Sequence, residues 1–560
     1  MLANRLSAVV AAAIVFAAAG PGPAAAQDDR TLTIGVSQFA STLHPSIEAA
    51  VAKSIVLDMA RRPFTTFDAN WELICMLCTE LPTLENGLAV LEQTPDGKDG
   101  IALTYTIQPG ATWADGTPLT TSDVEFAWQV GRHPQSPFDN IELYRQIYAI
   151  DIADARTFTL HVDKVEFDYN GINDLRVLPA HLERPIFESD PVEYRNRTLY
   201  NTDPTNPGLF FGPYKIVEIE SGAFMVLEPN DTWYGDPPFF QRIVVRTIEN
   251  TAAMEANLLS GSIDMISGEL GITIDQALAF QQRHGDAYNI IFQPGLIYEH
   301  IDMNLDNPLL QDVRVRRALL YALDREALVG QLFEGHQPVA TTSVSPLDWV
   351  YDEGVRHYGY DPDHARALLD EAGFSEIIDG VRHNAAGEKL MFVFMTTAGN
   401  RTRELVQQVL QSQWNEVGIE TVIRNEPARV YFGGTLSERN FTGLAMFAWV
   451  SSPENVPRTT LHTDHIPTAE NNWAGQNYTG NSNAAMDTLI EATEVELDRD
   501  RRRELWRWIQ AVYAETLPVL PLYYRANPYI LPTWLEGVVP TGHQYGTSLW
   551  VENWHRRSGS

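Results

Sequence analysis

The chain is too long to fold around a single hydrophobic core. It has 560 residues, whereas one core stops growing at roughly 250–300 residues and longer chains divide into domains. Hydrophobic residues make up 44% of the sequence and charged residues 20%, which is typical of a folded protein rather than a disordered one. The sequence therefore predicts two or three packed domains.

The first residues have the features of a secretion signal. Arg5 supplies a positive charge, residues 6–19 form an almost unbroken apolar run, and Ala24 to Ala26 offer the small side chains that a signal peptidase needs. The apolar run is shorter than the ~20 residues of a membrane helix, although an N-terminal membrane anchor is the alternative. No cysteine follows the expected cleavage point, which disfavours a lipid anchor. We predict a signal peptide over residues 1–26 and export of a soluble protein to the periplasm.

The charge balance excludes two classes of partner. There are 40 basic and 73 acidic residues, which gives a net charge of −33. Nucleic acids and anionic membrane surfaces both reward positive charge, so neither is expected to bind this chain. The net charge does not determine the sign of the field inside a binding cleft.

The two cysteines of the sequence, Cys75 and Cys78, are separated by only two residues. In an oxidising compartment they can close a small disulfide loop, and paired buried thiols are the alternative. A redox-active pair needs a helix N-terminus to lower the pKa of a thiol, and Pro82 and the residues before Cys75 do not favour one. A metal site would need two further ligands, and no second cysteine pair is present.

Strand and helix patterns alternate along the whole chain, without a repeat. Residues 31–36 and 103–107 alternate polar and apolar side chains, as half-buried strands do. The Asp115-Gly116 pair predicts a turn with positive φ. Thr120 and Asp123 form a capping box before a helix. Helices are further expected over residues 313–332, from the cap Asp361 to Gly373, over 484–496, and over 499–515 with Leu505, Trp508, Ile509 and Val512 on one face; an apolar strand follows over 519–524.

Seven segments, in order, resemble the family 5 extracellular solute-binding proteins, which are the dipeptide, oligopeptide and nickel binders of ABC importers. They span nearly the whole chain after the signal. They are residues 113–120 with Asp123-Val124, 211–214, 228–237, 259–264, the run 304–318, residues 360–374, and residues 517–522.

The resemblance implies an α/β fold of the type II periplasmic-binding-protein kind, with two lobes and an additional domain (cluster C). The three domains would close around a ligand by hinge motion. The expected division is residues 27–70, 208–296 and 525–560 for domain I, residues 71–207 for domain II, and residues 297–524 for domain III.

The resemblance also implies where the ligand lies. Peptide binders of this family add an extended ligand as a strand to short protein segments. By position these are Ala49, Ala50 and Val51, and then the run Ala448, Trp449, Val450, Ser451 and Ser452.

In the family's peptide binders an acid after this tryptophan receives the α-ammonium of the ligand. Ser452 stands there instead, so either Glu454 replaces the acid or the ligand has no free α-amine. Trp449 is expected to form an apolar wall of the cleft, although a place in the core is the alternative.

The resulting prediction is a monomeric, non-enzymatic protein that delivers peptides to the permease subunits of an ABC importer, without a cofactor. A non-peptide solute, such as an opine-like compound, a sugar or a metal chelate, is the alternative within the same fold. His462 and His465 have a spacing that keeps a metal ligand open, but a polar loop explains them more simply. A secreted hydrolase lacks support, since no G-x-S-x-G, S-x-x-K, H-E-x-x-H or P-loop motif occurs.

Overall fold

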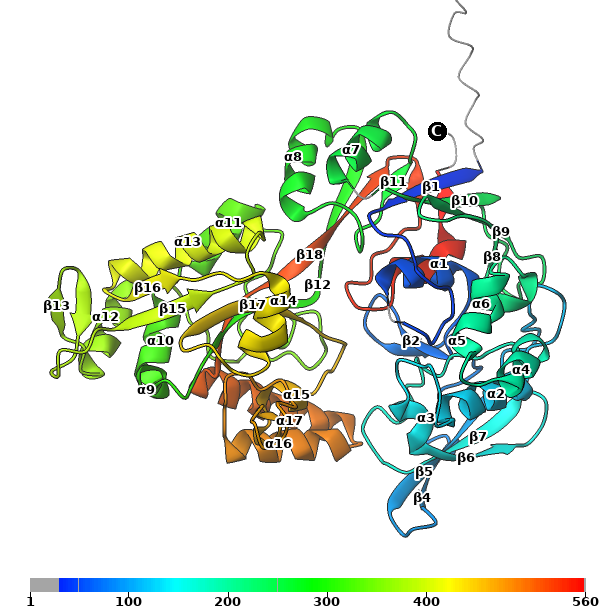
Figure 1. Ribbon diagram of the computed structural model, residues 1–560, viewed down its shortest axis with the longest axis horizontal. Coiled ribbons are helices and arrows are strands. Elements are labelled where there is room, and N and C mark those ends of the chain that lie inside the picture. The colour runs from blue at the N-terminus through cyan, green and yellow to red at the C-terminus, as the bar shows by residue number, and fades with distance from the viewer. Residues whose placement is uncertain (1–29, 49, 249, 558–560) are drawn as a thin grey trace, which may run out of the picture.

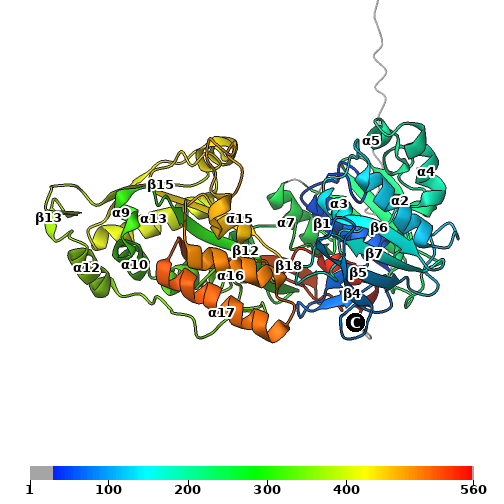
Figure 2. The same cartoon turned by 90° about the horizontal axis from the view of Figure 1, so that it is seen from below.

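The computed structural model describes residues 30–557 apart from residues 49 and 249. Its chain forms two lobes (Figure 1). The first lobe contains the N-terminal part of the described chain and its C-terminal end, and the second contains the middle (Figures 1 and 2). The predicted signal peptide and Ala49 lie outside the described residues.

A ten-stranded mixed sheet extends through both lobes. β1 pairs in parallel with β10 and β11 in the first lobe, whereas β15 pairs in parallel with β16 and β17 in the second. In spatial order the strands are β16 (Glu420–Ile423), β15 (Met391–Met395), β17 (Leu444–Val450), β12 (Tyr288–Met303), β18 (Val519–Pro532), β11 (Met265–Ile266), β1 (Thr31–Val36), β10 (Arg242–Thr247), β9 (Phe224–Pro229) and β8 (Tyr214–Glu220).

Two long antiparallel strands, β12 and β18, connect the lobes. Their ladder has a register shift between Pro294 and Tyr298 of β12. At this shift a Cβ atom on Gly295 would lie 2.8 Å from the carbonyl oxygen of Gly542, so only glycine fits without movement of the backbone. The irregular stretch lies where the sequence predicted the chain to leave domain I, close to Leu296.

The first lobe adds a four-stranded antiparallel sheet and covering helices. One continuous hydrophobic core joins the parts that the sequence assigned to domains I and II, from Leu32 through Trp113 to Trp554. The remaining elements here are β2 (Thr65–Phe67), β3 (Leu73–Cys75), β4 (Ala89–Gln93), β5 (Asp99–Thr106), β6 (Ile147–Ile152), β7 (Thr157–Val162), β19 (Leu535–Glu536), β20 (His555–Arg556), α1 (Val51–Ala60), α2 (Thr121–Arg132), α3 (Glu142–Gln146), α4 (Ala180–Ser189), α5 (Tyr194–Arg197), α6 (Leu199–Thr202), α7 (Thr251–Leu259), α8 (Ile274–His284), η1 (Pro207–Leu209) and η4 (Thr547–Asn553).

The second lobe packs its helices around the other end of the sheet. Trp414 is fully buried, and its indole N–H donates to the carbonyl oxygen of Leu319 over 2.8 Å. The elements are α9 (Pro308–Gln311), α10 (Val313–Tyr321), α11 (Arg325–Phe333), α12 (Pro362–Glu371), α13 (Arg401–Glu416), α14 (Ala428–Val430), α15 (Arg458–Leu461), α16 (Ala484–Val495), α17 (Arg499–Thr516), β13 (Glu376–Ile378), β14 (Val381–His383), η2 (Tyr431–Leu436) and η3 (Thr463–His465).

Predictions based on local signals are confirmed. β1 covers the expected residues, β5 overlaps most of its predicted range, and Gly116 has a φ of 91°. The capping box is present, since the backbone N–H of Thr120 donates to Asp123 over 2.8 Å. Asp361 caps α12 through the N–H of His364 at 2.9 Å.

Three predicted elements are wrong in part. The helix expected over residues 313–332 is two helices, because Asp324 accepts from the N–H of Ala327 and caps a second helix. In α17 the residue that packs into the core is Trp506, whereas Trp508 is 63% exposed. The strand expected to end at Tyr524 continues to Pro532 because it pairs with β12 across the crossing.

A disulfide joins Cys75 and Cys78, with their Cα atoms 5.1 Å apart.

Within the described part of the chain, no helix has both the length and the apolar character to cross a membrane.

Candidate functional site

A cavity of about 620 Å³ lies between the lobes, which is within the usual range for a ligand site. Trp71, Asp168 and Tyr545 line it from the first lobe, and Ser452 and Glu454 line it from the second. Because both lobes contribute, the shape of the cavity depends on the angle between them.

The lobes already touch beside this cavity. The backbone N–H of Phe167 donates to the carbonyl oxygen of Glu494 over 2.9 Å, and the guanidinium of Arg502 lies 5.0 Å from the centre of the Phe167 ring. Arg499 and Glu72 form an ion pair between the lobes at 3.0 Å. The lobes are therefore in contact at the edge of the interlobe cavity.

The predicted run, which covers the end of β17 and the loop after it, is divided between two cavities. Ser452 lines the interlobe cavity, whereas Trp449 and Val450 line a smaller neighbour of about 100 Å³ in the second lobe. Trp449 is half-buried and packs edge-on against Phe447, with ring centres 5.2 Å apart. Ala448 lies opposite Glu299 in the ladder between β17 and β12, so its backbone is already paired on that side.

The first predicted pairing segment is not an extended strand in this structure. Val51 is the first residue of α1, and Ala50 is its extended N-cap residue. A helix directs its first free N–H groups along its axis and cannot add a ligand as a strand at that point. Val51 therefore does not offer an extended backbone to a ligand, whereas Ala50 does, and Ala49 lies outside the described residues.

The carboxylate of Glu454 is already occupied. It pairs with the guanidinium of Arg502, and it accepts from the indole N–H of Trp349 over 3.0 Å. Its own backbone N–H donates to Asp348 at 2.6 Å. Burial raises the pKa of Glu454 although Arg502 opposes that rise. Glu454 is thus held as part of the cavity wall, with its charge compensated inside the protein.

One acid of the interlobe cavity has no such partner and was missed from the sequence. Among the described residues, no cation forms an ion pair with Asp168, whereas Asp174 pairs with Arg176 at 2.8 Å. Asp168 is exposed towards the cavity, and desolvation together with the nearby carboxylate of Glu166 raises its pKa to about 6. No sequence signal marks this residue, because its position in the cavity depends on a contact between lobes.

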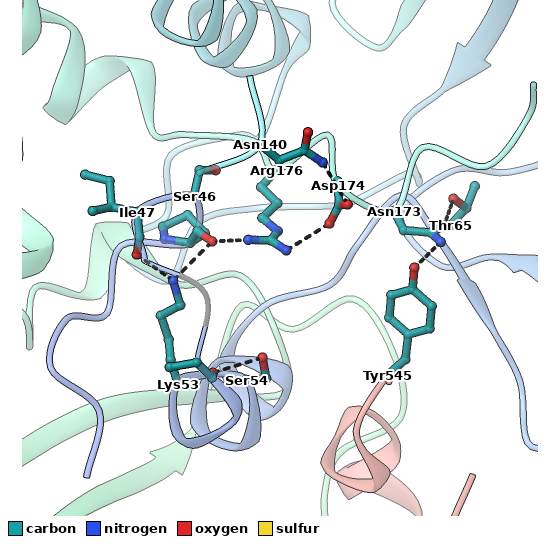
Figure 3. A network of polar contacts seen from close by, with 12 residues as sticks. Ser46, Ile47, Lys53, Ser54, Thr65, Asn140, Asn173, Asp174, Arg176 and Tyr545 are labelled. Atoms are coloured by element: carbon teal, nitrogen blue, oxygen red, sulfur yellow. Dashed lines mark hydrogen bonds and ion pairs between the residues drawn. The ribbon is translucent and has the colours of Figure 1, made fainter. Parts of the chain in front are cut away.

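A basic cluster beside the cavity fixes the loop before α1 (Figure 3). Lys53 donates to the carbonyl oxygens of His44 and Ile47, each over 2.8 Å, and burial lowers its pKa to about 8. Arg176 donates to the carbonyl oxygen of Pro45. These two cations hold the backbone of the loop. In the sequence, Lys53 stands out because it lies within an otherwise apolar helix.

His462 and His465 lie in and beside the short helix η3. No group of three or more His, Cys, Asp or Glu side chains in the described part of the chain is arranged to hold a metal ion. His462 is 3% exposed and caps η3 by accepting from the N–H of Asp464. The ring centres of His462 and His465 are 6.3 Å apart.

The fold agrees with comparisons to known proteins. The model of the bacterial extracellular solute-binding proteins, family 5, matches residues 87–467, which is more than half of the chain. The chain belongs to this family. Family 5 proteins are extracellular solute-binding proteins, and the interlobe cavity is the candidate solute site of this member.

Individual relatives cover most of the chain. The oligopeptide-binding protein AppA of Bacillus subtilis is 27% identical over 85% of each chain. A crystal structure of the oligopeptide-binding protein of Thermus thermophilus with a pentapeptide is 31% identical, with a TM-score of 0.68 over 94% of this chain and 96% of that one. The fold alone is shared with the Campylobacter jejuni protein NikZ in complex with Ni(L-His), at 21% identity, a TM-score of 0.69, and coverage of 95% and 100%.

Proposed function

We propose that this chain captures peptides between its lobes and delivers them to the permease subunits of an ABC importer. The observation that carries the proposal is the cavity of about 620 Å³ lined from both lobes, in a chain 31% identical to a pentapeptide-binding protein. Closure around a ligand buries it in a dry site, where backbone hydrogen bonds give affinity without selecting for side chains. No turnover of the peptide is part of the proposal.

The proposed domain division follows the predicted boundaries, with the hinge at the crossings of β12 and β18. The register shift between Pro294 and Tyr298 supports this placement, since an irregular ladder bends more easily than a regular one. Export to the periplasm by the signal over residues 1–26 and a monomeric state complete the proposal.

Peptide binding is tested by thermal unfolding and calorimetry. Purified protein is titrated with pooled peptides of two to nine residues. A peptide present at 100 times its Kd adds ~2.7 kcal/mol to the free energy of unfolding, so it is expected to raise the melting temperature. Native mass spectrometry of the protein as purified identifies any solute that copurifies. If no peptide raises the melting temperature, the peptide proposal fails.

A non-peptide solute is the second candidate. It is favoured by Ser452 in the place of the ammonium-binding acid and by the pairing of Glu454 with Arg502, since neither offers a free charge to an α-amine. A copurifying mass that corresponds to a sugar, an opine-like compound or a metal chelate would support this candidate over peptides.

A further inference from the structure

The smaller cavity in the second lobe is built differently from the interlobe cavity. It holds about 100 Å³ and is lined by side chains of β12, β17 and α17, including Tyr298, Asp302, Trp449 and Tyr513. Asn455 lines both cavities, so the two are neighbours. The volume corresponds to about three water molecules, which suits the end of a side chain but not a peptide main chain.

A buried carboxylate of this cavity has no arginine or lysine partner among the described residues. Asp302 is 3% exposed, and among the described residues the one basic side chain within ion-pair distance is His300, whose Nε2 lies 3.3 Å from Oδ1 of Asp302. Nδ1 of His300 lies 3.1 Å from the carbonyl oxygen of Tyr298. Nε2 makes no hydrogen bond within the described structure, so the imidazole is not aimed well at the acid.

A neighbouring acid on the same strand shows how this fold compensates a buried charge. Glu299 is fully buried, and its carboxylate receives the guanidinium groups of Arg403 at 2.6 Å and of Arg525 at 2.9 Å. An isolated buried charge costs several kcal/mol, so acids that serve only the fold are paired in this way. Asp302 lacks an equivalent arginine among the described residues and instead borders the smaller cavity.

The walls of the cavity are suited to a cation. The rings of Tyr298, Tyr513 and Trp449 line it, and the faces of aromatic rings attract ammonium and guanidinium groups. The hydroxyl groups of Tyr298 and Tyr513 are 2.7 Å apart and bond to each other. An aromatic enclosure with one carboxylate at its wall recognises positive charge rather than an aliphatic side chain.

We propose that this cavity is a subsite for a cationic group of the bound ligand, an ammonium or guanidinium that enters beside Asn455 and pairs with Asp302. The inference rests on the proposed function and adds a charge preference to it. The cation has two possible sources in a peptide, the α-ammonium and the side chain of Lys or Arg. An α-ammonium paired with Asp302 would no longer need the acid that Ser452 replaces.

The test compares matched pentapeptides by calorimetry. An alanine pentapeptide carries Lys or the isosteric norleucine at each position in turn, with a free or an acetylated N-terminus. Asp302→Asn is expected to weaken the cationic peptide about 10- to 100-fold and its neutral analogue less than about threefold, as for loss of a buried charge pair. A difference that follows Lys assigns the subsite to a side chain, and one that follows acetylation assigns it to the terminus.

Asp306→Asn is the matched control, because Asp306 pairs with Arg439 at 2.8 Å on the surface, and its side chain is 69% exposed. It is expected to leave the affinity of both peptides unchanged. If Asp302→Asn weakens cationic and neutral peptides equally, Asp302 has a structural role and the subsite is refuted. The wild-type protein gives an answer without any variant, since equal affinity for Lys and norleucine peptides at every position, and for free and acetylated termini, also refutes it.

A small cation separates failure of this inference from failure of the proposed function. Agmatine carries a guanidinium and an ammonium group without a peptide bond. It is expected to raise the melting temperature of the wild-type protein at millimolar concentration, and not that of Asp302→Asn. If no peptide binds at all, the proposed function fails, and the comparison with agmatine alone supports or refutes the subsite.

Discussion

Replacement of Glu299 by Gln tests whether the buried ion network between β12 and β18 stabilises the second lobe. Glu299 is fully buried and receives Arg403 and Arg525, the second of which lies at the predicted return to domain I. Burial alone would raise the pKa of Glu299, but Arg525 and Arg403 outweigh it and hold this pKa below its usual value of 4.5. The carboxylate is therefore ionised at neutral pH.

The expected loss follows from what the substitution leaves behind. Gln keeps the shape of the side chain but removes its charge, so two guanidinium groups lose their partner, and the Arg403 side chain is only 9% exposed. Breaking a buried ion pair in this way costs about 3–5 kcal/mol. The double variant Glu299→Gln with Arg403→Met leaves only one guanidinium group without its partner. It is therefore expected to lower the free energy of unfolding by less than the sum of the two single variants.

Urea unfolding at pH 7.5, followed by circular dichroism and tryptophan fluorescence, measures this loss. The surface control Asp306→Asn is expected to change the free energy of unfolding by less than about 1 kcal/mol. The lowered pKa of Glu299 stabilises the fold at every pH above 4.5, and this contribution disappears as the pH falls through the lowered value. The gap between wild type and variant should thus narrow only in acid. A loss below 1 kcal/mol at pH 7.5, or a gap that is independent of pH down to acid unfolding, would refute the reasoning.

Three further predictions concern stability. Burial raises the pKa of Asp58 to about 7, so the fold loses stability as the pH rises from 3.8 to 7. Asp58→Asn removes this loss and is expected to add up to about 4 kcal/mol to the free energy of unfolding at pH 8. The melting temperature should therefore rise at pH 8 and not at pH 4. Replacement of both Cys75 and Cys78 by Ser removes the disulfide that closes a short loop, and should lower the free energy of unfolding by about 2 kcal/mol. Adding a reductant should then cause no further loss of stability in the variant. Gly295→Ala places a Cβ atom 2.8 Å from the carbonyl oxygen of Gly542 and should lower the free energy of urea unfolding by about 1–3 kcal/mol. In Gly222→Ala the added Cβ atom meets no atom within 4 Å, so that variant measures the cost of a positive φ alone.

Elements with a complete local signal could be predicted from the sequence. Asp361 and Pro362 begin α12 because a side-chain cap and a fixed φ act within four residues. The helix expected over residues 313–332 failed for a similar local reason. Its apolar period continues past Tyr321, but Asp324 can also cap a helix, and that cap was not recognised within a periodic run.

Tertiary packing decided the other differences. In α17 the hydrophobic pattern allows either Trp506 or Trp508 to face the core, and the contact with Val344 and Met486 selects Trp506. The cleft shows the same limitation. Glu454 is one acid among many in the sequence, and its pairing with Arg502 depends on α17 packing beside the loop after β17. Periodicity carries no information on which acid lacks a cation.

The two acids of β12, Glu299 and Asp302, are three residues apart. Because side chains alternate along a strand, they point to opposite faces of the sheet. On one face Glu299 meets Arg403 and Arg525, and the charge is satisfied by the fold itself. On the other face Asp302 borders the smaller cavity, which shares Asn455 with the interlobe cavity. Both acids are buried, and Asp302 has no arginine or lysine partner among the described residues, so a bound cation is expected to stabilise it. Ligand binding and lobe structure thus depend on neighbouring residues of one strand, and the charge of the solute is expected to influence the stability of the bound state through Asp302.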